Sequence, residues 1–278
     1  MAMTTRGSCG RTIKMAAMHP ARLLSAAACA AALWCLALPA EAGRTFVEVG
    51  SGRGLAATVV PFMLVDREGL LWVGSREGLY RYDGYLATAF RPVPGDPHSL
   101  SDIDVRSLYE GRDGSLWVST NTAGLNRLDR RTGRFTRYAH DSSDPGSLSD
   151  PSVYGIAEDG RGRIWVGSQR GLNRLDARTG RFVRFFHEPA RAGSLANDWV
   201  YALHRGHSGE LWIGTVGGGI DRWDEERARF VNLRPSQLTG GEATLDDIFA
   251  LHEAPDGRLW AGTRGGLVVI EPSSGTGR

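Results

Sequence analysis

Cysteine is scarce in this sequence. Of its 278 residues only Cys9, Cys29 and Cys35 are cysteines, so none lies beyond the first 35 positions. The remainder of the chain therefore has no disulfide, no thiol nucleophile and no thiolate metal site. Lysine is scarcer still, because Lys14 is the only one.

A strong net charge is also lacking. The chain has 33 basic and 31 acidic residues, of which residues 1–42 hold four and one, leaving 29 and 30 and a net charge of −1. Nucleic-acid binding depends on clustered cations that neutralise phosphates. A near-neutral chain therefore argues against a nucleic-acid partner.

Long apolar runs are missing after the N-terminal region. There, four basic residues precede a low-charge run over residues 23–38, and Ala40-Glu41-Ala42 follows. This order is typical of a secretory signal peptide. The alternative is a membrane anchor, but the run is shorter than the ~20 residues of a spanning helix. We predict that residues 1–42 are a signal peptide and that the mature chain, without a membrane span, is periplasmic or secreted.

What the sequence does contain is a repeat. A tryptophan inside a short apolar run recurs five times, at spacings of 45, 48, 47 and 48 residues. This period matches a propeller blade and is too long for most helical-pair repeats. The five runs are residues 71–75, 116–120, 164–168, 211–215 and 259–263.

The third copy indicates how one unit folds. We expect strands over residues 153–157, 163–168, 172–175 and 181–185, joined by glycine-containing turns. A four-stranded meander cannot bury both of its faces alone, so neighbouring units must pack on it. The repeated tryptophan supplies a large apolar surface for that contact. The predicted fold is all-β, a β-propeller of about five four-stranded blades after the signal peptide.

The predicted propeller spans residues 43–278. Its repeats lie at about 58–102, 103–150, 151–198, 199–245 and 246–278. The fifth repeat lacks an outer strand, whereas residues 45–49 stand where an outer strand would precede the first repeat. We predict that residues 45–49 close the last blade, because closure removes an open sheet edge. The alternative is that the chain is a fragment of a larger propeller.

The links between the repeats point to a family. Asp96-Pro97-His98-Ser99-Leu100-Ser101-Asp102 is repeated as Asp144-Pro145-Gly146-Ser147-Leu148-Ser149-Asp150, and a weaker version is Ser194-Leu195-Ala196-Asn197-Asp198. With Leu-Trp-Val-Gly-Ser and Gly-Leu-Asn-Arg-Leu-Asp, these links closely resemble the two-component regulator propeller repeat. This repeat occurs in periplasmic sensor regions of bacterial histidine kinases and diguanylate cyclases. The resemblance implies an extracytoplasmic input domain that binds a ligand, although this sequence carries no kinase, cyclase or DNA-binding region.

No catalytic constellation emerges from the sequence. His204 and His252 occupy equivalent positions in the fourth and fifth repeats, but no carboxylate motif accompanies them. The Asp-Gly turns lack the successive Asp/Asn positions and the closing Glu of a calcium loop. We therefore predict no catalytic residue, no metal site and no cofactor.

The candidate binding surface follows from propeller geometry. Loops that lead into the innermost strands and turns that join the second and third strands share one face, around the channel mouth. The candidates from these loops and from the second positions of inner strands are Arg106, Asn121, Tyr154, Gln169, Arg170, Trp199, Tyr201 and Arg264. Aromatic rings among Arg, Asn and Gln suit a small polar ligand or an oligosaccharide. The alternative is that the rings only pack between blades and the arginines are solvated.

Three functions remain open at this stage. The first is a non-catalytic sensor propeller that binds a ligand and lacks its output domain. The second is a propeller enzyme of the lyase or hydrolase type, because one fold hosts many functions. The third is a scaffold that binds a protein partner, which a flat apolar patch without a pocket would favour.

Overall fold

The computed structural model describes residues 51–271 and 276–277. The chain divides into two units, Met1–Glu48 and Val49–Arg278. All of these residues belong to the second unit. The signal peptide predicted over 1–42 and the closing strand predicted over 45–49 therefore lie outside the described residues.

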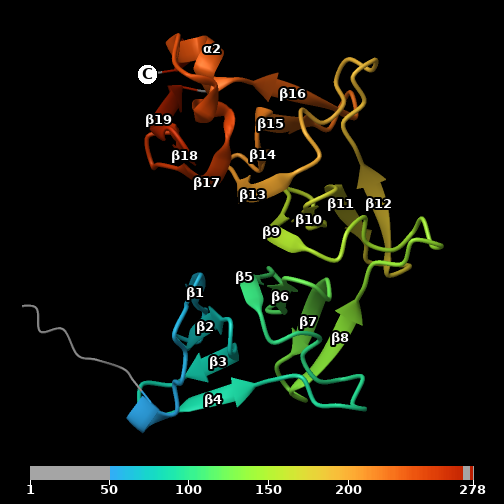
Figure 1. The fold of residues 1–278 in the computed structure, drawn as a ribbon, viewed down its shortest axis with the longest axis vertical. Coiled ribbons are helices and arrows are strands. Elements are labelled where there is room, and N and C mark those ends of the chain that lie inside the picture. Colours follow the sequence, from blue (N-terminus) through green and yellow to red (C-terminus); the bar gives the residue numbers. More distant parts are fainter. Residues whose placement is uncertain (1–50, 272–275, 278) are drawn as a thin grey trace, which may run out of the picture. The chain divides into compact units, whose positions relative to one another are not determined.

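Five four-stranded antiparallel sheets follow one another along the chain, and the strands of each sheet pair in sequence order (Figure 1). The prediction of five meander blades is confirmed. Blade 1 holds β1 (Phe62–Val65), β2 (Leu71–Ser75), β3 (Gly78–Tyr82) and β4 (Ala87–Phe90). Blade 2 holds β5 (Val105–Glu110), β6 (Leu116–Thr120), β7 (Leu125–Asp129) and β8 (Arg134–Tyr138).

The remaining blades repeat this order. Blade 3 holds β9 (Val153–Glu158), β10 (Ile164–Ser168), β11 (Gly171–Asp176) and β12 (Arg181–Phe185). Blade 4 holds β13 (Val200–Arg205), β14 (Leu211–Thr215), β15 (Gly219–Asp224) and β16 (Arg229–Leu233). Blade 5 holds β17 (Ile248–Glu253), β18 (Leu259–Thr263), β19 (Gly266–Glu271) and β20 (Thr276–Gly277). The inner strands β1, β5, β9, β13 and β17 lie beside one another in that order.

The fourth strand of blade 5 comes from the C-terminal end of the chain. Thr276 pairs with Glu271, and Gly277 pairs with Ile270. The outer position next to β19 thus holds β20 along these two residues. The proposed role of residues 45–49 at this edge stays a prediction.

Two short helical turns interrupt the link between blades 4 and 5. The helix α2 (Pro235–Thr239) begins on a proline and ends at Gly240, whose φ of 66° is left-handed, and η3 (Ala243–Asp246) follows. Asp246 accepts hydrogen bonds from the backbone N–H and the hydroxyl of Ser236. The sequence pattern did not predict these turns, because four or five residues are too few to display a helical period.

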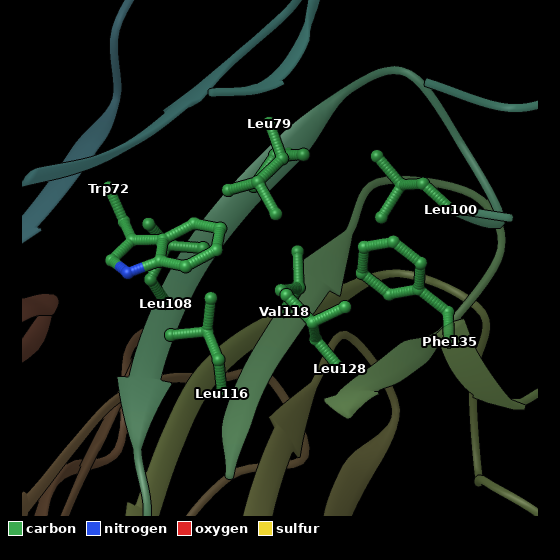
Figure 2. Close-up of a cluster of buried hydrophobic side chains, with 9 residues drawn as sticks. Trp72, Leu79, Leu100, Leu108, Leu116, Val118, Leu128 and Phe135 are labelled. Carbon is green, nitrogen blue, oxygen red and sulfur yellow. The ribbon is translucent and has the colours of Figure 1, made fainter. Parts of the chain in front are cut away.

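The hydrophobic core lies between consecutive blades. Figure 2 shows the contact of blades 1 and 2, where Trp72 and Leu79 of blade 1 meet Leu108, Leu116 and Val118 of blade 2. The same arrangement recurs at the next three contacts, where Trp117, Trp165 and Trp212 pack against the following blade. These four tryptophans are at most 4% exposed, so their predicted packing role is confirmed.

Glycine in the second strand lets the blades approach closely. A Cβ on Gly74 would lie 2.8 Å from Val105 of blade 2, and one on Gly167 would lie 2.6 Å from Val200 of blade 4. The same position in blade 4, Gly214, would meet Ile248 of blade 5 at 2.6 Å. The repeated glycine is therefore a packing requirement, since real Cβ atoms do not approach neighbours so closely.

The links that resemble the family pattern are held by the third strand of the following blade. The Asn126 side-chain oxygen accepts the N–H of Ser101 at 3.0 Å, and that of Asn173 accepts the N–H of Ser149 at 2.8 Å. Each Asn amide also donates to a carbonyl of the second strand, Val118 or Val166. Asp221 takes this position in blade 4 and accepts the N–H of Ala196 at 2.9 Å.

Asp221 has no amide hydrogen to donate. Its Oδ1 is buried and has no hydrogen-bond partner among the described residues. Burial raises the pKa of the Asp221 carboxyl to about 6, and the hydrogen bond from Ala196 offsets only part of this effect. The protonated carboxyl is favoured because it regains the donor that Asn126 and Asn173 supply.

We expect Asp221→Asn to stabilise the protein at pH 7. The carboxyl binds its proton more tightly in the folded chain, so stability falls as pH rises from about 4 to about 6 and stays lower above that range. The variant should gain about 1–3 kcal/mol at pH 7 and lose this pH dependence. Urea unfolding between pH 4 and 8 measures both effects.

Asn173→Asp is the matched control. It places a carboxylate in the equivalent buried position of blade 3 and should introduce the same decline of stability with rising pH. An unchanged pH slope in Asp221→Asn would contradict the assignment.

Candidate functional site

Four inner-strand residues owe their position to a β-bulge. In β5, Val105 pairs with Thr120 and Ser107 with Ser119, so Arg106 is the extra residue. Tyr201 in β13 and Phe249 in β17 are extra in the same way, and the ladder of β9 is irregular around Tyr154. Bulges re-aim side chains and are frequent next to functional sites. Here they set one residue from each of blades 2 to 5 against a common cavity.

A cavity of about 830 Å³ lies along the inner strands. Residues of all five inner strands line it, including Arg106, Tyr154, Tyr201 and Phe249. Its volume falls within the range of small-molecule pockets. Three of the eight candidates predicted from the sequence, Arg106, Tyr154 and Tyr201, are lining residues.

The aromatic side chains form a row across three blades. The rings of Tyr154 and Tyr201 stack at a centroid distance of 5.0 Å and an angle of 22°. Phe249 meets Tyr201 edge-on at 5.1 Å, and Trp199 lies 6.3 Å from Tyr154. Tyr154, Tyr201 and Phe249 contact one another in this row and also line the cavity, whereas the candidate Trp199 does not line it. The same rings can therefore both pack between blades and contact a ligand.

Unpaired polar atoms accompany this row. Arg106 forms an ion pair with Asp104 at 2.9 Å, yet its Nε and the Asp104 Oδ1 are buried without a hydrogen-bond partner in the described part of the chain. The indole Nε1 of Trp199 is also buried without a hydrogen-bond partner among the described residues. A buried polar atom without a partner costs about 1–3 kcal/mol. A ligand with hydrogen-bond acceptors would recover part of that cost at Arg106.

The other candidates lie on the rim above the inner strands. The backbone N–H of Asn121 donates to Asp104, that of Gln169 to Ser152 and that of Arg264 to Asp247. The turns between second and third strands therefore lie beside the segments that lead into the inner strands, as the propeller geometry predicted. None of Asn121, Gln169, Arg170 and Arg264 lines the cavity.

The charged rim candidates are exposed and paired. The Arg170 Nε lies 3.7 Å from Asp150, and its side chain is 81% exposed. Arg264 pairs with Asp247 at 3.0 Å. These two arginines are thus solvated surface groups within reach of their carboxylates, which is the alternative considered for them from the sequence.

The other end of the inner strands brings together residues that were not among the candidates. Tyr109, His204 and Arg205 line the cavity there. The His204 ring meets that of His252 at 5.8 Å, and its Nε2 accepts the backbone N–H of Glu253 at 3.1 Å. Both histidines lie inside strands, in β13 and β17, at the position that pairs with the repeated tryptophan. Because His204 and His252 occupy equivalent positions in adjacent repeats, the sequence already indicated that they lie close together.

Burial lowers the pKa of His204, and the charge of the neighbouring His252 lowers it further. Its hydrogen bond from Glu253 requires an unprotonated Nε2, which also favours the neutral ring. His207 lies nearby, 3.5 Å from a Glu253 oxygen. Within the described ranges, no group of three or more His, Cys, Asp or Glu side chains is arranged to hold a metal ion.

The class of protein follows from this arrangement. Sequential four-stranded meanders with their inner strands side by side, and a cavity between those strands, define a β-propeller. In the described part of the chain, no helix has the length and apolar character needed to cross a bilayer.

Sequence comparison finds a family model in four of the repeats. The family model described as "Two component regulator propeller" matches residues 99–122, 147–170, 194–217 and 244–265. The predicted resemblance to this repeat is therefore confirmed for these four segments. Each match covers a link, an inner strand and the Trp-containing second strand. No curated protein matches the chain.

Solved structures share the fold. The extracellular domain of a hybrid two-component system from B. thetaiotaomicron superimposes with a TM-score of 0.71 at 23% identity, over 84% of this chain and 31% of that one. That of a one-component system from the same organism gives 0.67 at 23% identity, over 83% and 32%. Virginiamycin B lyase from Staphylococcus aureus gives 0.58 at 16%, over 79% and 69%. The chain spans about a third of the length of the two B. thetaiotaomicron domains.

We expect His204 to titrate below the value of about 6.5 that is ordinary for histidine. Because its folded pKa is lowered, its contribution to stability is complete above about pH 6.5 and is lost as pH falls below that value. Replacement of His252 by Asn should raise the pKa of His204, since a repelling charge is removed. Histidine NMR titration measures both. A His204 that titrates at or above 6.5 would contradict the assignment.

Proposed function

We propose that this chain is a non-catalytic, extracytoplasmic input propeller of a bacterial signal-transduction system, which binds a small polar ligand or an oligosaccharide between its inner strands. The observation that carries this proposal is the cavity of about 830 Å³ bordered by Arg106 and the row Tyr154, Tyr201 and Phe249. The family of the repeats supports the signalling role.

The chemistry of the cavity favours a ligand with hydroxyl groups. Aromatic faces stack on the apolar face of a sugar ring, and the buried Arg106 Nε donates to an oxygen acceptor. Arg106 is held by Asp104, so the positive charge of the guanidinium is already balanced. A neutral, acceptor-rich ligand suits this pair better than a strongly charged one.

Two observations support an extracytoplasmic location. The N-terminal sequence has the order of a signal peptide. The structurally similar domains of two B. thetaiotaomicron signalling systems are described as extracellular. The present chain covers about a third of each of those chains. The proposal therefore includes an output partner that receives the signal from this propeller.

A lyase function is the alternative that the similarity to virginiamycin B lyase raises. Such an enzyme needs a general base in the cavity, and the residues that line the cavity include His204 but no Asp, Glu or Lys. The Nε2 of His204 already accepts the N–H of Glu253, so it is not free to take a proton from a substrate. The cavity therefore favours binding over catalysis.

We expect Tyr154→Ala and Tyr201→Ala each to weaken ligand binding by about five- to hundredfold, because stacking of a ligand ring on one aromatic side chain contributes about 1–3 kcal/mol. The measurement is a thermal-shift screen of neutral oligosaccharides and polar metabolites, followed by calorimetry on each hit. Tyr85→Ala is the control, because Tyr85 is an exposed tyrosine outside the cavity lining.

Arg106→Gln separates the polar contribution from stacking. It should weaken binding of hydroxyl-rich ligands while leaving the Tyr154–Tyr201 stack in place. Binding that is unchanged in all three cavity variants would overturn the assignment of the site. Turnover of a bound ligand would favour the lyase alternative.

A further inference from the structure

The last residue of the inner strand has one role at the contacts of blades 1 and 2, 2 and 3, and 4 and 5. It is Glu110 in β5, Glu158 in β9 and Glu253 in β17, and the three have the same register against the second strand. Each carboxylate accepts a backbone N–H from a turn of the preceding blade. The donors are Arg67, Arg112 and His207, at 3.0, 2.8 and 2.7 Å. These glutamates therefore join consecutive blades at the end of the inner strands opposite the bulges.

Blade 4 has an arginine at this position. Arg205 is the last residue of β13 and has the same register as the three glutamates. A guanidinium has no acceptor, so it cannot bind the N–H of a turn. In the turn of blade 3, the N–H of Gly160 donates instead to the carbonyl oxygen of Gly209 at 3.1 Å. The backbone thus makes the contact of blades 3 and 4 that a glutamate makes elsewhere.

The Arg205 side chain lines the cavity of about 830 Å³, whereas the three glutamates do not. Its Nε is buried without a hydrogen-bond partner, and Arg205 forms no ion pair within the described part of the chain. The strands on both sides of β13 are β9 and β17. Their carboxylates at the same level, Glu158 and Glu253, are already held by the turns of blades 2 and 4. Burying such a donor without a partner is unfavourable.

The charge of the cavity lining is therefore concentrated at one end. Arg106 and Arg205 line the cavity, and no Asp, Glu or Lys is among the described residues around it. Asp104 balances the charge of Arg106 at 2.9 Å, but Arg205 has no such partner. Tyr109 lines the same end, and burial raises the pKa of its hydroxyl, so the hydroxyl stays protonated and can donate.

We infer that Arg205 binds a single carboxylate of the ligand, so that the ligand of this cavity is an acidic oligosaccharide. The inference rests on the proposed function, because it assigns a charge to the ligand of the same cavity. A planar guanidinium binds a carboxylate through parallel N–H donors. One uncompensated guanidinium matches one negative charge, whereas a doubly charged phosphate would exceed it.

The two ends of the cavity bind different parts of such a ligand. Four residues of extended strand separate Tyr201 from Arg205, which is about 13 Å between their Cα atoms. The uncharged, hydroxyl-rich part lies on the aromatic row and at the Arg106–Asp104 pair. The carboxylate lies at Arg205, with the Tyr109 hydroxyl as a second donor.

The experiment is calorimetry of the purified full chain with disaccharides and trisaccharides that contain one glucuronic or galacturonic acid. Each acid is compared with its neutral methyl ester. We expect at least one acid to bind about ten- to hundredfold more tightly than its ester, as a charge-assisted hydrogen-bonded pair contributes. Arg205→Gln should weaken binding of the acid by the same factor and leave binding of the ester unchanged.

Two further variants separate binding from folding. Arg205→Glu introduces the residue that joins the blades at the other three contacts, so we expect it to fold with an unchanged melting temperature and to reject the acid. Arg161→Gln is the matched control. Arg161 lies in the turn of blade 3, is 68% exposed, pairs with Glu225 and is not a lining residue, so its replacement should keep the preference for the acid.

The possible outcomes distinguish this inference from the proposed function. An ester that binds as tightly as its acid, or a preference that survives Arg205→Gln, would overturn the inference. If neutral sugars bind and Tyr154→Ala weakens them, but no acid binds more tightly, the ligand site stands and only its assigned charge is wrong. If no acid, ester or neutral sugar binds, both the proposed function and the inference are wrong.

Discussion

The contact between consecutive blades is the interaction on which the rest of this structure depends. A four-stranded meander is hydrophobic on both faces, so no blade is stable alone. The Trp that recurs in every copy, the Leu or Ile of the third strand, and in blades 1, 3 and 4 the Gly of the second strand are the residues that meet the next blade. The close approach at Gly74, Gly167 and Gly214 sets the distance between inner strands. That distance in turn defines the cavity. The proposed ligand site between the inner strands follows from this one repeated contact.

Buried polar side chains occupy defined positions in the same packed blades. Asn126 and Asn173 clamp the links to the third strands, while Asp221 does so with a carboxyl whose pKa is raised to about 6 by burial. At the cavity, Arg106 is balanced by Asp104 and still has a buried donor without a partner. The first group is expected to make stability depend on pH, and the second supports the proposed preference of the cavity for ligands with acceptor atoms. In both cases a polar atom is buried by the packing of its neighbours.

The candidate site was only partly predictable. Arg106, Tyr154 and Tyr201 were found because they share the second position of an inner strand, and periodic position is visible in a sequence. Asn121, Gln169, Arg170 and Arg264 come from turns on the correct face but lie on the rim, because turn position does not specify which way a side chain points. His204 and Tyr109 were missed because the candidates were taken from one end of the inner strands, whereas the cavity extends along these strands to the position that pairs with the repeated tryptophan.

By itself the sequence determined the number of repeats, the four strands of each, their order and the family repeat that they resemble. These features are local or periodic, so spacing, turn glycines and tryptophans suffice to read them. Only the tertiary structure decided which residues meet across blades. The bulges that turn Arg106, Tyr201 and Phe249 to the cavity, the burial that perturbs Asp221 and the exposure of Leu267 all depend on a neighbouring strand or on its absence. Equivalent residues in the repeat differ in environment for that reason, and a repeat pattern cannot distinguish them.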